Sequence, residues 1–260
     1  MGIQLKNIFS KNKKKKIGII VEARSNSSRL PNKHFLLVLK KPIIEFLIKR
    51  LKKVSNADEI IMATTTKKND DKLCAIAKNN GIKYFRGSED NVVERVLKAA
   101  KKYKVEIICR VTGDCPIIDP YLIEQLVDTF SVNFDKIDYI SNSQLGLPNG
   151  MGCEVFSTKA LKKSYSKIFK KDEIEHVSLN IRRQKIFKKI YLMPLKQLSW
   201  SSLGLTLDEY KDFILIKKLI EYFNKKKQLM TCKKIIELLR QKNWYKINNL
   251  VERKEDKLKI

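Results

Sequence analysis

Glycine and proline are scarce in this chain of 260 residues, which contains only nine glycines and six prolines and shows no internal repeat. This scarcity excludes collagen-like chains and proline-rich low-complexity chains. Hydrophobic residues make up 43% of the sequence, which is enough for a core and too much for a disordered protein. Because no linker rich in Pro, Gly or Ser divides the chain, we expect one domain, residues 17–225. It would carry a basic N-terminal tail, 1–16, and a C-terminal helical extension with a charged tail, 226–260.

Long apolar runs are absent too. No run approaches the roughly 20 residues that a membrane-spanning helix needs, and the N-terminal segment lacks the apolar stretch of a secretory signal. The five cysteines form no CxxC pair, and their wide spacing argues against a disulfide framework or a zinc site. We therefore expect a cytoplasmic protein with reduced thiols and no membrane span.

Negative charge is in short supply, since 28 acidic residues face 55 basic ones and leave a net charge of +27. Of the basic residues, 45 are lysines spread along the whole chain, whereas proteins that read DNA rely on arginine for bidentate base contacts. The excess favours a solvated lysine-rich surface and no specific nucleic-acid partner. Non-specific nucleic-acid binding remains as a remote alternative.

Apolar runs and helical patterns alternate through the first half of the chain. The pattern predicts strands at 16–23, 58–65, 82–87, 105–114 and 136–142, and helices at 41–54, 69–81, 90–103 and 119–130. Such alternation is typical of an α/β protein with a mostly parallel sheet between two layers of helices, a three-layer αβα fold. Binding sites in these folds lie at the carboxyl ends of the strands.

The second half of the chain has a more mixed pattern. We expect strands at 152–157 and 187–194, helices near 158–169, 173–184 and 231–242, and a short strand that turns into a long helix over 203–223.

The first expected strand runs into a basic loop, VEARSNSSRLPNK at 21–33. The loop has neither the GxxxxGK[ST] pattern of a P-loop nor the GxGxxG pattern of a dinucleotide site. It offers serine hydroxyls and three cations, Arg24, Arg29 and Lys33, which suit a polyphosphate. Spacing alone leaves a phosphate loop and a solvated basic loop as open alternatives.

Two aspartates end later segments of the chain. Asp114 closes the apolar strand in RVTGDCPIIDP, where Asp119 already supplies the Asp-Pro helix start. Asp208 precedes a helix in LTLDEY, and taken alone it favours a helix N-cap. Beside phosphates, however, two carboxylates are the protein ligands that Mg²⁺ commonly takes, so Asp114 and Asp208 together form a candidate metal pair.

Several of these stretches resemble one known family in order and spacing. They are IGIIVEARSNSSRLPNKHFL, DEIIMATTT, YFRGSEDNVVERV, RVTGDCPIIDP, EVFS, EHVS and LTLDEYKDF. The chain is similar over about 17–225 to the cytidylyltransferase-like proteins of spore coat polysaccharide biosynthesis. These are related to the cytidylyltransferases for acylneuraminates and 3-deoxy-manno-octulosonate. The resemblance implies a nucleotide-diphosphosugar-transferase-like fold of the GT-A type. It also implies Mg²⁺-dependent transfer of CMP from CTP to a sugar acid or sugar phosphate with pyrophosphate release, for a surface polysaccharide.

The resemblance also implies roles for particular residues. The nucleotide would be bound by Ala23, Arg24, Ser27, Arg29, Lys33, Arg86 and Gly113. Arg24, Lys33 and Asp114 would be catalytic, Asp114 and Asp208 would hold the metal, and Glu154 and His176 would contact the anionic acceptor. Relatives further suggest a homodimer.

The chain departs from its relatives at four positions. Relatives usually have Gln where Glu22 stands, Gly where Asn26 and Asn32 stand, and often an acidic residue where Gly152 stands. These changes leave the identity of the acceptor open. They also leave open whether the donor is CTP or instead GTP or UTP. A glycosyltransferase of the same fold is the alternative enzyme, although such enzymes normally carry a DxD motif where this chain reads TGDCP.

Overall fold

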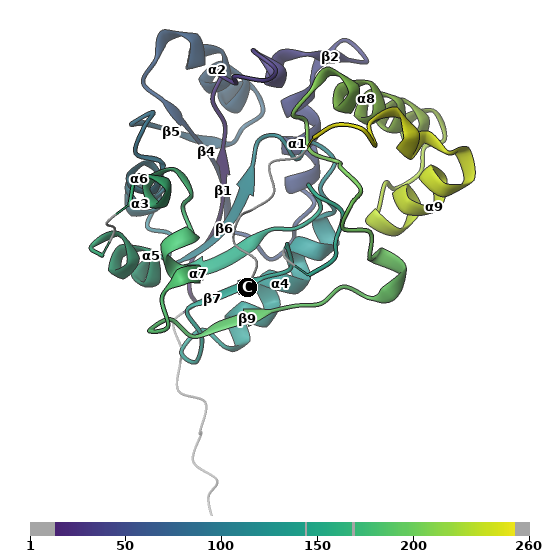
Figure 1. Ribbon diagram of the computed structural model, residues 1–260. Helices are drawn as coiled ribbons and strands as arrows, with labels where there is room; N and C mark the ends of the chain where they lie inside the picture. The colour runs from purple at the N-terminus through teal and green to yellow at the C-terminus, as the bar shows by residue number, and fades with distance from the viewer. Residues whose placement is uncertain (1–13, 144, 168–169, 253–260) are drawn as a thin grey trace, which may run out of the picture.

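The computed structural model describes residues 14–143, 145–167 and 170–252. Residues 1–13 of the predicted basic tail (1–16) and residues 253–260 of the predicted C-terminal extension (226–260) lie outside them. Its centre is a seven-stranded sheet with the order β5-β4-β1-β6-β8-β7-β9 (Figure 1). The strands are β1 (Ile17–Glu22), β4 (Glu59–Thr65), β5 (Lys83–Gly87), β6 (Ile107–Thr112), β7 (Tyr139–Ser141), β8 (Glu154–Ser157) and β9 (Lys189–Tyr191). The four strands β5, β4, β1 and β6 are parallel, while β8 is antiparallel to both of its neighbours. The predicted mostly parallel α/β sheet is therefore confirmed.

Helices cover both faces of this sheet. They are α1 (Ile43–Leu51), α2 (Asp71–Asn79), α3 (Val92–Lys102), α4 (Pro120–Val132), α5 (Thr158–Tyr165), α6 (Lys171–Glu175), α7 (Leu179–Arg183), α8 (Tyr210–Lys225) and α9 (Cys232–Lys242). Short 3-10 turns lie at η1 (Lys33–Phe35), η2 (Lys68–Asp70), η3 (Lys196–Leu198) and η4 (Trp244–Ile247). This gives the predicted three-layer αβα arrangement.

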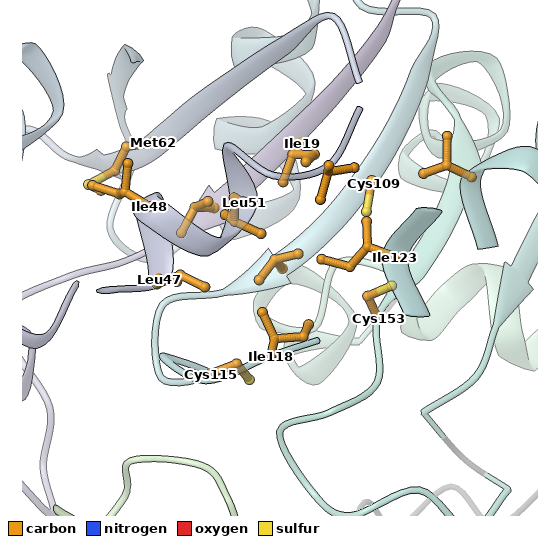
Figure 2. Close-up of a cluster of buried hydrophobic side chains, with 14 of the residues drawn as sticks. Ile19, Leu47, Ile48, Leu51, Met62, Cys109, Cys115, Ile118, Ile123 and Cys153 are labelled. Carbon is orange, nitrogen blue, oxygen red and sulfur yellow. The ribbon is translucent and has the colours of Figure 1, made fainter. Parts of the chain in front are cut away.

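Alternate residues of β1 point to opposite faces of the sheet, as the period of a strand requires. Ile19 and Val21 pack with α1, α2 and α4 on one face. Figure 2 shows Ile123 close to Cys109 and Cys153 in this cluster. Residues of the opposite face, such as Ile20, pack with α3, α5 and α7. Five fully buried positions in β1 thus fix the strand in the middle of two cores. All five cysteines of the chain are free thiols.

A third apolar cluster lies at one end of the molecule, where Figure 1 shows α8 beside α9. Leu203, Leu205 and Leu207 point into it, which explains why the sequence at 203–208 alternates like a strand. The segment does not join the sheet, and its one bridge joins Asn149 to Gly204. The prediction of a strand there is wrong because the alternation reflects burial against α8 and α9 and not sheet pairing.

The structure departs from the sequence analysis in three further places. The helix expected at 173–184 is broken into α6 and α7, because the backbone at His176 is extended. The hairpin of β2 (Leu37–Val38) and β3 (Lys41–Pro42) was not predicted, because its two left-handed turn positions are occupied by Leu39 and Lys40 and not by the Asn-Gly that such a turn favours. The helix expected to reach 169 ends at Tyr165, and residues 168–169 lie outside the described part of the chain.

Asp119 caps α4 as predicted, and it also ties α4 to α9. One of its carboxylate oxygens accepts from the backbone N–H of Tyr121 (3.2 Å) and the other from that of Cys232 (2.7 Å). Replacing Asp119 with alanine leaves a buried donor at Cys232, so we expect the free energy of unfolding to fall by about 2 kcal/mol. The melting temperature should fall by about 4–8 °C. Gln125→Ala on the exposed face of α4 is the control, and equal melting temperatures for the two variants would contradict the double cap.

Candidate active site

A pocket with a volume of about 350 Å³ opens at the carboxyl ends of β1 and β6. Five parts of the chain form its wall: the loop after β1, the end of β6, helix α3, the end of α6 with the next residue, and the residue before the N-cap of α8. Its lining residues are Glu22, Ala23, Arg24, Asn26, Ser27, Ser28, Arg29, Lys33, His34, Val92, Arg95, Thr112, Gly113, Asp114, Glu175, His176 and Asp208. The pocket therefore lies where α/β sheets commonly bind ligands.

The basic loop is held in place by Asp70, which sequence analysis did not single out. One oxygen of the Asp70 carboxylate accepts from the backbone N–H of Ser25 at 2.7 Å, and the other accepts from the hydroxyl of Thr65. Burial opposes ionisation of Asp70, but the hydrogen bonds from Ser25 and Thr65 keep its pKa below the usual value. From the sequence, Asp70 was expected only as part of the start of the helix at 69–81, whereas its side chain turns to the loop after β1.

Four charged groups of the pocket lining form a tight cluster. The ammonium of Lys33 lies 3.2 Å from Oδ2 of Asp114 and 3.3 Å from Oδ1 of Asp208, and Nη2 of Arg29 lies 2.9 Å from the same Asp208 oxygen. Lys33 is only 8% exposed. Burial disfavours the Asp114 carboxylate, but Lys33 and the hydroxyl of Thr112 hold its pKa below the usual value. The structure thus joins residues that are 175 positions apart.

The backbone explains how Asp208 reaches this cluster. The N–H of Leu207 donates to the carbonyl oxygen of Asp114 at 2.8 Å, so the next residue, Asp208, lies beside Asp114. The N-cap of α8 is Glu209, and the side chain of Asp212 accepts its backbone N–H at 3.0 Å. Asp208 is therefore not the N-cap that its position before a helix alone suggested.

Gly113 allows β6 to end at this place. A Cβ atom there would lie 2.9 Å from both the Cβ of Ala23 and the Cε1 of His34. These contacts are closer than side chains tolerate, so the Gly in TGD lets β6 approach the loop after β1 and directs Asp114 into the pocket.

The donor set fits the predicted Mg²⁺ in its chemistry. Asp114 and Asp208 already converge on one cation, the ammonium of Lys33. No cluster of three acidic, histidine or cysteine side chains suited to a metal occurs in the described part of the chain. A Mg²⁺ here would take its other ligands from phosphate and water, as this ion commonly does.

Outside the cluster around Lys33, the pocket is also lined by Glu22, Arg24, Glu175 and His176. Nη2 of Arg24 lies 3.6 Å from Oε1 of Glu175; the Arg24 side chain is partly buried and that of Glu175 is exposed. His176, which was predicted to contact the acceptor, lines the pocket. Ser27 is also in the lining, and its hydroxyl accepts from the N–H of Leu30 at 3.4 Å.

A chain of buried charges begins at Glu22, which lines the pocket. Arg110 on β6 pairs with both oxygens of Glu22 (2.7 and 3.0 Å) and with Oε2 of Glu154 (2.7 Å). The other oxygen of Glu154 accepts from the hydroxyls of Tyr139 (2.6 Å) and Ser178 (2.7 Å). The sequence signal for this network is Arg110, an arginine within a mostly apolar strand, and no role was predicted for it.

Two predicted site residues lie outside the pocket lining among the described residues. Glu154 is 5% exposed and both of its oxygens have partners within the protein, so a direct contact with the acceptor stays a prediction. Arg86 braces the loop after β4, donating to the carbonyls of Thr65 (3.0 Å) and Lys67 (2.9 Å) and pairing with Asp71 at 2.7 Å. Its predicted contact with the nucleotide likewise stays untested.

Gly152 stands where relatives often carry an acidic residue. A Cβ atom at this position would lie 2.4 Å from the Cα of Ser143. The neighbouring backbone therefore fills the space that such a side chain would need.

In the part of the chain that the structure describes, no helix is long and apolar enough to span a bilayer.

Comparison with known proteins identifies the family. A family model described as Cytidylyltransferase matches residues 18–255. An uncharacterized protein of Methanocaldococcus jannaschii, MJ1063, is 37% identical over 206 residues, which are 79% of this chain and 83% of that protein. The spore coat polysaccharide biosynthesis protein SpsF of Bacillus subtilis is 28% identical over 212 residues, 78% of this chain and 85% of SpsF.

Among solved structures, a cytidylyltransferase from Leptospira borgpetersenii serovar Hardjo-bovis superposes with a TM-score of 0.83 and 31% identity. The match covers 92% of this chain and 100% of that one. The family match spans nearly the whole sheet, the basic loop and both aspartates of the cluster. The chain belongs to the cytidylyltransferase family, and it is a nucleotidyltransferase of the α/β type.

Proposed function

We propose that the protein transfers CMP from CTP to an anionic sugar, either a sugar acid or a sugar phosphate, and releases pyrophosphate. The observation that carries this proposal is the ammonium of Lys33 between the carboxylates of Asp114 and Asp208, at the end of a serine-rich basic loop. Cations that face a triphosphate beside a carboxylate pair are the parts that in-line attack on an α-phosphate requires.

Each side of the cluster has its own task in this reaction. Arg24, Ser27, Arg29 and Lys33 bind the β- and γ-phosphates, while the backbone at Ala23 and Gly113 allows the nucleotide to approach the sheet. As the bond to the α-phosphorus breaks, negative charge grows on the leaving pyrophosphate. Fixed cations stabilise that charge most in the transition state.

Asp114 and Asp208 are the residues that would hold Mg²⁺. When bound, the ion neutralises phosphate charge next to the α-phosphorus. Since Lys33 and Arg29 pair with these carboxylates in the structure, phosphates that enter the pocket offer both cations new partners.

The acceptor lies, on this proposal, at the end of the pocket formed by Glu175 and His176. Its hydroxyl or phosphate oxygen attacks the α-phosphorus on the side opposite to pyrophosphate. His176 contacts the acceptor, and Ser178 ties the backbone after His176 to Glu154 at 2.7 Å. SpsF is named for spore coat polysaccharide biosynthesis, and we place this reaction likewise in the supply of activated sugars for a surface polysaccharide, in the cytoplasm.

A pyrophosphate-release screen tests the proposal. The purified protein is incubated with each of the four NTPs, crossed with sugar acids and sugar phosphates, with Mg²⁺ or with EDTA. We expect pyrophosphate only when CTP, Mg²⁺ and one acceptor are present together. Turnover of a nucleotide sugar without pyrophosphate would instead indicate a glycosyltransferase.

A further inference from the structure

Arg95 is a buried arginine that lines the pocket, and neither the sequence analysis nor the proposed reaction assigns it a role. It lies on the second turn of α3 and is 2% exposed. Its Nη1 donates to the carbonyl oxygens of Ser88 (2.5 Å) and Glu89 (3.4 Å). Its Nε is buried and has no hydrogen-bond partner.

The guanidinium of Arg95 lacks a counter-anion among the described residues, since no carboxylate there lies within ion-pairing distance of it. The carboxylate of Glu22, in the same pocket, is already bound bidentately by Arg110. Burial lowers the pKa of Arg95 and Arg24 lowers it further, although Glu22, Asp70 and Glu89 attract the guanidinium from beyond ion-pairing distance. Buried charges are normally paired, so a buried, unpaired cation on a pocket wall indicates a missing anion.

We propose that Arg95 binds the anionic group of the acceptor, the carboxylate of a sugar acid or the phosphate of a sugar phosphate. The inference rests on the proposed nucleotidyl transfer, and it deepens that function by assigning the acceptor's charged group to a subsite on α3. Guanidinium groups suit this ligand because two of their N–H groups can face the two oxygens of one oxyanion.

The position of Arg95 favours the acceptor over the triphosphate. Of the three cations assigned to the triphosphate, Arg29 and Lys33 are gathered at Asp114 and Asp208. The third, Arg24, pairs with Glu175. The helix of Arg95, α3, packs instead against α6, which leads into Glu175 and His176 (Figure 1). The acceptor end of the pocket would thus combine one buried cation with a histidine.

The alternative is that Arg95 only braces the turn at Ser88 and Glu89. A brace needs the hydrogen bonds of Nη1 and requires no anion. The two roles therefore predict different results when the positive charge is removed, and when the negative charge is removed from the acceptor.

The test is steady-state kinetics with the acceptor found in the pyrophosphate screen. For Arg95→Met we expect the KM of the acceptor to rise about 10- to 100-fold, the loss of one charge-assisted interaction. The KM of CTP should change less than about twofold. Arg95→Lys, which keeps the charge, should restore part of the affinity, and Lys98→Met on the exposed face of α3 should change neither value.

A neutral analogue of a sugar-acid acceptor, with the carboxylate converted to a primary amide, completes the cycle. For a sugar phosphate, whose phosphate oxygen is itself the nucleophile, the neutral dimethyl triester is compared with the phosphate as an inhibitor. Wild-type protein should discriminate against the neutral compound about 10- to 100-fold, and Arg95→Met should discriminate little. An equal rise in the KM of CTP, or equal use of acceptor and analogue by the wild type, would overturn the assignment. The second comparison needs no variant, so it holds even if Arg95→Met does not fold.

Failure of the proposed function can be told apart from failure of this subsite. If no NTP and acceptor pair gives turnover, inorganic phosphate is titrated calorimetrically into Arg29→Met and Arg29→Met/Arg95→Met proteins. A loss of phosphate affinity of about tenfold on adding Arg95→Met supports the anion subsite without the reaction. Equal affinities overturn it.

Discussion

Replacing Asp114 with asparagine is expected to lower the rate of pyrophosphate release about 10²- to 10³-fold, the usual effect of removing one group that stabilises transition-state charge. The amide keeps the shape of the side chain but removes one of the two carboxylates that face Lys33. A metal held there would lose a charged ligand, and Lys33 would lose one of the two groups that position it. The measurement is kcat with saturating CTP and acceptor.

A matched control separates this effect from a general loss of charge. Asp135 is an exposed aspartate after α4, and Asp135→Asn should leave kcat unchanged. Thermal melting of both variants should show that the chain still folds. Full turnover by Asp114→Asn would mean that the carboxylate pair is not part of the reaction.

The second large effect concerns Arg110. Arg110→Met removes the shared partner of Glu22 and Glu154 and leaves two buried carboxylates without their cation. Breaking a buried ion pair typically costs about 3–5 kcal/mol, so the melting temperature should fall by about 10 °C or more. Thermal melting at pH 7 measures it.

A neutral version of the same network provides the control. Glu22→Gln/Arg110→Met/Glu154→Gln removes all three charges, and it should recover most of the stability that Arg110→Met loses. If the triple variant melts no higher than Arg110→Met, the loss came from packing and not from the uncompensated carboxylates.

The pH dependence of stability has a definite sign at Glu154. Burial alone would raise its pKa, but Arg110 and Arg182 lower it from 4.5 to about 2. A lowered pKa in the folded state stabilises the protein fully above pH 4.5, and this stabilisation is lost as the pH falls from there toward 2. In the triple variant, the fall in melting temperature over this range should be smaller.

The sequence predicted the site well where neighbouring strands end. The loop after β1 and Asp114 after β6 could be expected to meet, because the two strands are parallel neighbours and their carboxyl ends share one edge. Asp208 was harder to place. It reaches the pocket through the hydrogen bond between Leu207 and Asp114. Carboxylate chemistry and the resemblance to cytidylyltransferases both made it a candidate partner of Asp114, but no sequence pattern showed this backbone contact.

Other parts of the site depend on side-chain direction, which a single sequence does not reveal. Asp70 precedes α2 as a helix cap would, yet its carboxylate turns to Ser25. Arg95 lies on a helix among buried valines, where the helical period predicts core and says nothing of a pocket. The break at His176 likewise arises from contacts distant in sequence, since Ser178 donates to Glu154 on β8.

Transfer of radiolabel from CTP tests the central claim most directly. With CTP labelled at the α-phosphorus and the acceptor from the screen, the label should move into a sugar-linked CMP while unlabelled pyrophosphate is released in equal amount. Label that stays with free nucleotide, or release of orthophosphate in place of pyrophosphate, would contradict transfer of CMP by this protein.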